Sequence, residues 1–170
     1  IIEGQGTVGV EILEELPEID YLFVPVGGGG LSAGVGSYFK TYSPKTKIVG
    51  LEPEGAPSMS EALKAGHPVT VENIDRFVDG ASVKQVGAKT FAICAKGLAR
   101  MLTVSKKALC QTMLDLYSLS SMIVEPAGAL SVAGLEEMSE EIKGKTVVCV
   151  ISGGNFDPKR FPEIKSLASA

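Results

Sequence analysis

Two glycine-rich turns contain the residues of this sequence whose types and spacing could do chemistry. Val26-Gly27-Gly28-Gly29-Gly30-Leu31 follows one apolar run, and Ile151-Ser152-Gly153-Gly154-Asn155 follows another. The first turn precedes a predicted helix, so its backbone N–H groups can converge on an anion such as a phosphate. Glycine lets that anion approach the backbone closely. Together the two turns predict a seat for a phosphorylated cofactor.

The elements around these turns alternate between strand and helix patterns, which is typical of a parallel sheet covered by helices. Strands are predicted over residues 21–26, 47–51, 101–104 and 145–151, the last as a β-branched central strand. Helices are predicted over residues 7–16, 32–42, 58–65, 87–99, 106–119 and 125–137, with a terminal helix from Asp157 and Pro158. Ser105 is the predicted N-cap of the fifth helix, and Gly66 ends the third.

We therefore expect residues 1–170 to form a single α/β domain, built on an open, mostly parallel twisted sheet flanked by helices. In such folds ligands bind beyond the carboxyl ends of the strands. Both glycine turns fall at that edge.

Composition and charge argue against several classes of protein. A net charge of -4 and a sequence pI of about 5.1 offer no basic surface for nucleic acid. No apolar run approaches the ~20 residues of a membrane-spanning helix. The first residues of the sequence do not show the basic-then-apolar pattern of a signal peptide. Cys94, Cys110 and Cys149 have apolar neighbours, which predicts reduced thiols in the core. We expect a cytoplasmic protein that binds neither nucleic acid nor membrane.

The tetraglycine turn has two alternative interpretations. A structural tight turn would seldom need four glycines. A dinucleotide site would use Gly28, Gly30 and Ala33, which match the G-x-G-x-x-G/A pattern, with Glu52 as the ribose-binding acid. That interpretation gives the turn around Ser152 no function. The cofactor-phosphate seat is therefore favoured, and the dinucleotide-binding module stays as the alternative.

Several motifs resemble those of the fold-type II pyridoxal-phosphate enzymes. They are Gly27-Gly28-Gly29-Gly30-Leu31, Gly50-Leu51-Glu52-Pro53, Val78-Asp79-Gly80, Val124-Glu125-Pro126-Ala127-Gly128-Ala129 and Ser152-Gly153-Gly154-Asn155. With Glu3-Gly4-Gln5-Gly6-Thr7 near the start, they are similar to the threonine dehydratases, also called threonine deaminases or ammonia-lyases. Serine racemases share most of these motifs. The resemblance covers nearly the whole chain.

The resemblance implies pyridoxal 5'-phosphate as the cofactor, with its phosphate on the tetraglycine turn and Ser152 facing the pyridine nitrogen. A hydroxyl there leaves the ring neutral, which favours prompt loss of a β-leaving group. The implied reaction is α,β-elimination from L-threonine, and from L-serine, to give 2-oxobutanoate or pyruvate and ammonia, in a homo-oligomer. Gly29→Asp is expected to abolish cofactor retention. The implied cofactor contacts are Gly27, Gly28, Gly29, Gly30, Leu31, Gly80 and Ser152.

A cation site is also implied, because Glu52, Ala56 and Ser58 stand where relatives bind a divalent ion. Ser58 replaces an aspartate, and hard divalent cations prefer charged oxygen ligands. A divalent ion, a monovalent ion, water or no ligand at Glu52 and Ala56 all stay open. Glu125 at a helix start and Asp79 in a turn each have a structural interpretation beside the functional one.

The lysine that forms the Schiff base in this family lies in a Ser-Phe-Lys-x-Arg-Gly-Ala type segment, which does not occur in this sequence. The substrate-carboxylate loop of the Ser-Gly-Asn-His-Ala type does not occur either. Lys40, Lys45 and Lys47 are expected to be exposed, and His67 is assigned no chemistry. We expect the C-terminal part of a catalytic unit, without the lysine-bearing segment or a regulatory domain. The alternatives are a serine or threonine racemase, another fold-type II enzyme, or a non-catalytic association module.

Overall fold

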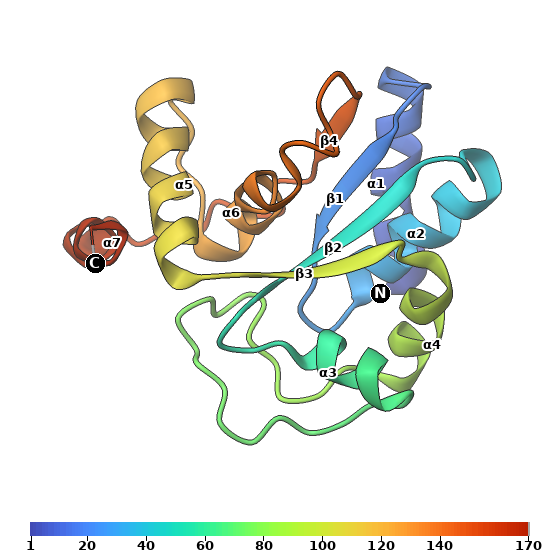
Figure 1. Cartoon of the computed structure of the whole chain (residues 1–170), viewed down its shortest axis with the longest axis horizontal. Helices are drawn as coiled ribbons and strands as arrows, with labels where there is room; N and C mark the ends of the chain where they lie inside the picture. The colour runs from blue at the N-terminus through green and yellow to red at the C-terminus, as the bar shows by residue number, and fades with distance from the viewer. Residues whose placement is uncertain (170) are drawn as a thin grey trace.

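The computed structural model describes residues 1–169 and contains a four-stranded sheet with helices on both faces (Figure 1). All of the strand pairs are parallel. The order across the sheet is β3-β2-β1-β4. The predicted open, parallel α/β architecture is confirmed. The strands are β1 (Tyr21–Pro25), β2 (Lys47–Pro53), β3 (Arg100–Val104) and β4 (Val147–Cys149).

The helices form two groups on the two faces of the sheet (Figure 1). One group is α1 (Ile2–Glu15), α2 (Gly30–Tyr42) and α4 (Ala88–Gly97), in which α2 packs against both α1 and α4. The other group is α5 (Lys106–Ser120), α6 (Pro126–Ala133) and α7 (Phe161–Ala168). A short helix, α3 (Ser58–Ala65), follows β2, and single 3-10 turns lie at Glu136–Met138 and Pro158–Arg160.

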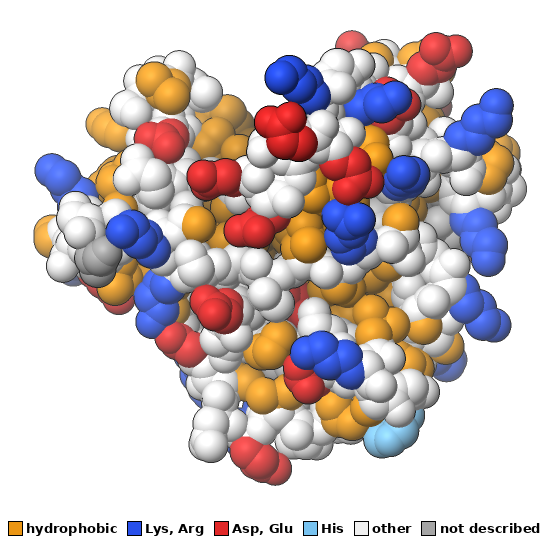
Figure 2. Space-filling view, viewed as in Figure 1, with side chains coloured by type: hydrophobic (Ala, Val, Ile, Leu, Met, Phe, Trp, Pro, Cys, Tyr) orange, Lys and Arg blue, Asp and Glu red, His pale blue; other side chains and the backbone are white. Residues whose placement is uncertain are grey.

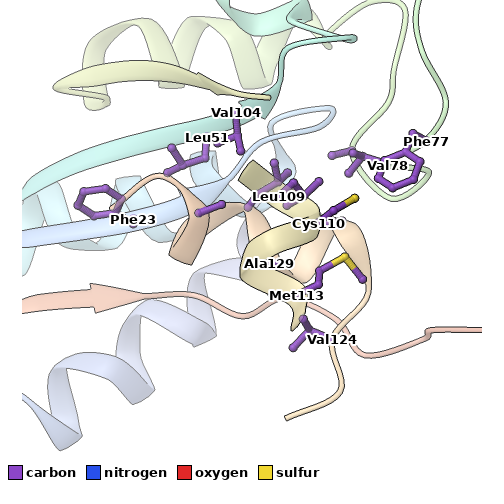
Figure 3. Packing of buried hydrophobic residues seen from close by; sticks show 14 of the residues in the cluster. Phe23, Leu51, Phe77, Val78, Val104, Leu109, Cys110, Met113, Val124 and Ala129 are labelled. Atoms are coloured by element: carbon purple, nitrogen blue, oxygen red, sulfur yellow. The ribbon is translucent and has the colours of Figure 1, made fainter. Parts of the chain in front are cut away.

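Strand β1 supplies side chains to the cores on both faces. Tyr21 and Phe23 belong to the larger apolar cluster, together with buried side chains of α5, α6 and α7. Figure 3 shows Phe23 with part of this cluster. Leu22 and Val24 point the other way, into the cluster beneath α1 and α2. Every residue of β1 is buried, which is the pattern of a strand covered by helices on both faces. The turn that follows β1 therefore starts from a strand that is buried on both faces and paired on both edges.

The predicted strand over residues 145–151 is wrong in extent and position. β4 covers only Val147–Cys149 and lies at an edge, paired with β1 alone. Lys145 and Thr146 instead form the approach to the strand, where the Thr146 N–H donates to the Asp20 carboxylate at 2.9 Å. The β-branched composition of this segment indicates a strand, but the position of a strand within a sheet depends on long-range pairing.

Helix boundaries differ from the predictions where tertiary packing decides them. α1 begins five residues before the predicted Thr7, because Gly6 and Gly34 allow α1 and α2 to touch backbone to backbone. A Cβ on Gly34 would lie 2.8 Å from the Gly6 nitrogen and would collide with the Ile2 carbonyl. α6 stops at Ala133, short of the predicted residue 137.

The two predicted caps are confirmed. The Ser105 hydroxyl accepts a hydrogen bond from the Ala108 N–H at 3.2 Å. Gly66 ends α3 in the left-handed conformation, with φ of 77°. Caps depend on residues close in sequence, which is why the pattern alone could locate them.

All three cysteines are free thiols, but only Cys94 and Cys110 are fully buried. Cys149, predicted to be a core residue, is partly exposed because β4 is an edge strand. Burial raises the pKa of Cys110 to about 11 and that of Cys149 to about 12. These thiols therefore stay protonated and unreactive near neutral pH.

Acidic and basic side chains are both present on the face shown in Figure 2, with apolar side chains between them. Near the amino ends of the strands, the Glu141 carboxylate forms two ion pairs. One oxygen lies 3.0 Å from the Arg100 guanidinium, and the other lies 3.8 Å from the Lys47 ammonium group. No helix within residues 1–169 combines the length and apolar character needed to cross a membrane.

Candidate functional site

A cavity of about 260 Å³ lies beyond the carboxyl ends of β1 and β4 and brings the two glycine turns together. All of the residues that the sequence assigned to the cofactor line it: Gly27, Gly28, Gly29, Gly30, Leu31, Gly80 and Ser152. The lining is completed by Pro25, Ala81, Glu125 and Ala127. A larger open groove of about 420 Å³ lies at the opposite ends of the strands, near Asp20 and Lys45, and contains neither glycine turn.

The tetraglycine turn leads directly into α2. Gly29 is the N-cap, in the left-handed conformation with φ of 83°, and Gly30 is the first helical residue. The first N–H groups of a helix have no acceptor within the helix. Within residues 1–169, the N–H groups of Gly28 to Leu31 donate to no protein acceptor. Together with the positive end of the helix dipole, they form a neutral backbone cradle for an anion.

Gly28 and Gly29 have different surroundings. A Cβ on Gly28 would meet no atom within 4 Å. A Cβ on Gly29 would lie 2.8 Å from the Met59 methyl group and 3.0 Å from the Thr90 Cβ. Gly29→Asp would therefore strain the turn whatever the turn binds. Gly28 is the position where a carboxylate would test anion binding by its charge alone.

The second turn is seated against the start of α6. The Glu125 N–H donates to the Gly153 carbonyl at 3.2 Å. A Cβ on Gly128 would collide with that same carbonyl, and a Cβ on Gly153 would collide with the Glu125 carboxylate. This contact holds the turn so that Ser152 lines the cavity. Glycine is needed at both positions for close approach.

Glu125 also lines the cavity. It is the N-cap residue of α6, but its side chain makes no capping hydrogen bond. Its carboxylate therefore belongs to the wall of the cavity rather than to the helix end. Sequence reasoning left this residue undecided, because a carboxylate before a helix proline suits the helix dipole without any further function.

Glu52 is buried and caps α3. Its carboxylate accepts hydrogen bonds from the Met59 N–H at 2.5 Å, the Ser60 N–H at 2.9 Å and the Ser60 hydroxyl at 2.8 Å. Burial raises the pKa of this carboxyl, although the three hydrogen bonds oppose the shift. Because both oxygens face donors, Glu52 is not free to bind a ribose, which removes the acidic partner of the dinucleotide interpretation.

The same contacts bear on the predicted cation. A metal ligand needs an oxygen that faces the ion, whereas both Glu52 oxygens face N–H and O–H groups. No group of three or more His, Cys, Asp or Glu residues able to hold a metal occurs within residues 1–169. The geometry gives Glu52 a structural role, and a cation at Glu52 and Ala56 stays a prediction that the present donor set does not favour.

The remaining sequence candidates lie away from the cavity. Asp79 is exposed and does not line it, although its neighbour Gly80 does. His67 is exposed, as expected, with its ring nitrogen 3.0 Å from the Pro68 carbonyl. Lys40, Lys45 and Lys47 are also exposed. No lysine of the described chain lines the cavity.

The arrangement suits a phosphorylated ring compound. One wall is a neutral set of N–H groups at a helix start, and the facing wall presents a hydroxyl and a carboxylate. The fold and the site therefore define an α/β protein with a cavity between two glycine turns that fits a phosphorylated cofactor. The chain belongs to the pyridoxal-phosphate dependent enzymes, a family that matches residues 1–153.

Threonine dehydratases and a serine racemase are among the proteins to which this chain is similar. L-threonine dehydratase biosynthetic IlvA of Halalkalibacterium halodurans is 52% identical over 166 residues, which are 97% of this chain and 40% of that protein. The processed form of threonine deaminase isoform 2 from Solanum lycopersicum is 40% identical, with a TM-score of 0.95 over 99% of this chain and 50% of that one. Maize serine racemase is 31% identical, with a TM-score of 0.86 over 97% and 53%. The chain spans about 40% of the length of the curated relatives it matches.

Proposed function

We propose that this chain forms the phosphate and ring-nitrogen side of the cofactor site in a pyridoxal-phosphate dependent threonine ammonia-lyase. The observation that carries the proposal is the single cavity lined by both glycine turns and Gly80. The names of the relatives, threonine dehydratase and threonine deaminase, support the choice of reaction.

Each part of the site has a distinct role in this proposal. The N–H groups of Gly28 to Leu31 bind the phosphate, and the helix dipole of α2 strengthens that binding. The Ser152 hydroxyl donates to the pyridine nitrogen and leaves it without a full positive charge. Bound pyridoxal phosphate supplies an electron sink for the α-carbon of an amino acid, which makes loss of a β-hydroxyl group feasible. Glu125 places a carboxylate in the wall of the same cavity.

The whole enzyme would act on L-threonine, and on L-serine, and release 2-oxobutanoate or pyruvate together with ammonia. Such an enzyme requires a catalytic lysine. We assign that lysine to a part of the protein other than these 170 residues, because no lysine of the described chain lines the cavity. We further propose that the enzyme is a cytoplasmic homo-oligomer.

The full-length protein that contains this chain provides the test. Pyridoxal phosphate is titrated against the apoprotein and followed by the absorbance of the bound cofactor, and oxo-acid release is measured with threonine and with serine. Saturable binding with release of 2-oxobutanoate is the expected result. Binding with interconversion of serine enantiomers and no oxo acid would instead favour a racemase. Failure to bind the cofactor would overturn the proposal.

A further inference from the structure

Two side chains of α4 contact carbonyl groups of the tetraglycine turn. Thr90 and Cys94 are four residues apart, so they lie on the same face of the helix. The Thr90 hydroxyl donates to the Gly28 carbonyl at 2.7 Å, and the Cys94 thiol lies 3.9 Å from the Gly29 carbonyl. Neither side chain lines the cavity. Both therefore touch the turn from outside that cavity, and Thr90 borders a separate open pocket together with Gly28 and Gly30.

These contacts determine where the N–H groups of the turn point. A trans peptide is planar, and its carbonyl points opposite to the N–H of the next residue; no cis peptide occurs within residues 1–169. A Gly28 carbonyl held toward Thr90 turns the Gly29 N–H away from α4. The Gly29 carbonyl is held in the same way, by the Ala33 N–H at 2.9 Å and by Cys94. The Gly30 N–H is thereby turned away from α4 as well.

Glycine residues cannot fix this orientation by themselves. Without a Cβ, each glycine has access to more of backbone conformational space than any other residue, and ordering it costs backbone entropy. An external contact on the carbonyl side limits the turn to one peptide orientation. The Thr90 hydroxyl has one proton and two carbonyl acceptors within reach, Gly28 at 2.7 Å and Gly87 at 2.9 Å, and the shorter contact is the one to the turn.

We propose that Thr90 is a positioning residue for the cofactor phosphate, and that Cys94 assists it one peptide further along the turn. Thr90 acts through the Gly28 carbonyl and touches no part of the cofactor. Its effect is therefore specific to the phosphate end of the ligand. This inference rests on the proposed cofactor site, but no residue of that site needs to be changed to test it.

The test compares two ligands on the full-length apoprotein, namely pyridoxal 5'-phosphate and pyridoxal, which lacks the phosphate. Thr90→Val removes the hydroxyl at nearly constant volume, and Thr90→Ser retains it as a matched control. We expect Thr90→Val to weaken binding of the phosphorylated ligand about tenfold, because a hydrogen bond to a charged group is misdirected. Pyridoxal binding should be unchanged, and Thr90→Ser should bind both ligands like the unmodified protein.

Other outcomes are equally clear. Equal weakening of both ligands by Thr90→Val would overturn the inference, because it would show a general structural effect. An unchanged preference for the phosphorylated ligand would overturn it too. If Thr90→Val does not fold, Cys94→Ala tests the same support, and a smaller loss confined to pyridoxal phosphate is expected. An unmodified protein that binds both ligands equally would instead overturn the proposed phosphate cradle itself.

Discussion

The two turns that meet in the cavity are held in place by different means. The tetraglycine turn follows β1, a strand buried on both faces, and side chains of α4 support it through its carbonyl groups. The turn at Ser152 follows β4, a three-residue edge strand, and rests on the backbone at the start of α6. The first turn is thus held by side chains that donate hydrogen bonds to it. The second is held by close backbone packing, which is possible because Gly128 and Gly153 have no side chain.

The largest expected effect tests the first turn by charge. Gly28→Asp places a carboxylate in open space beside the phosphate seat. At ~4 Å and an effective dielectric constant of about 20, two like charges repel by about 4 kcal/mol, which corresponds to a roughly thousandfold loss of affinity. Titration of the full-length apoprotein with pyridoxal phosphate measures this loss. Gly28→Asn is the matched neutral control, and equal affinity of the two variants would contradict the cradle.

The second turn is tested by volume. Gly128→Ala forces a methyl group against the Gly153 carbonyl, so we expect it to displace the turn and to destabilise the protein by about 1–3 kcal/mol. Urea unfolding measures the change. Gly97→Ala in α4 is the control, because a Cβ there meets nothing within 4 Å. Equal unfolding midpoints for the two variants would show that the turn does not need glycine at this contact.

A change behind the first turn should have an intermediate effect. Glu52 caps α3 at Met59, whose methyl group packs against Gly29. Glu52→Gln replaces one acceptor oxygen by an amide that cannot accept from the α3 N–H groups. We expect a loss of about 1–3 kcal/mol in the free energy of unfolding.

The pH dependence of that loss has a definite sign. Because burial raises the pKa of Glu52 above its ordinary value of 4.5, the carboxyl favours folding most below that pH. Its contribution decreases as the pH rises through the raised folded-state pKa. The difference in stability between the unmodified protein and Glu52→Gln should therefore shrink over that range in urea titrations. A difference that grows with pH would show that the carboxylate is stabilised in the folded state.

The smallest expected effect contrasts the two ends of the cofactor. Ser152 is exposed. Ser152→Ala removes the hydrogen bond proposed for the pyridine nitrogen, so we expect a loss of about 1 kcal/mol, or roughly fivefold in affinity. The pyridine nitrogen is common to pyridoxal phosphate and pyridoxal, so both ligands should lose affinity equally. A loss confined to the phosphorylated ligand would mean that Ser152 faces the phosphate.

The sequence predicted the local elements well because their signals are local. The apolar run before Gly27, the Ser105 cap and the Gly66 terminus each lie within a few residues of the element they define. Every residue that the motif pattern assigned to the cofactor lines one cavity of the structure. Thr90 was missed, because a threonine in the first turn of a helix has no signal that connects it with a glycine turn far away in the sequence.

By itself, then, the sequence determined that strands and helices alternate and that two glycine turns stand at strand ends. Only the tertiary structure decided that β1 lies inside the sheet and β4 at its edge, that Glu52 points into the start of α3, and that α4 supports the tetraglycine turn. The physical reason is how far apart in the sequence the interacting residues lie. Helix periodicity, caps and turns depend on neighbouring residues, whereas strand order, burial of a carboxylate and the orientation of a glycine peptide depend on contacts that form only when distant segments pack.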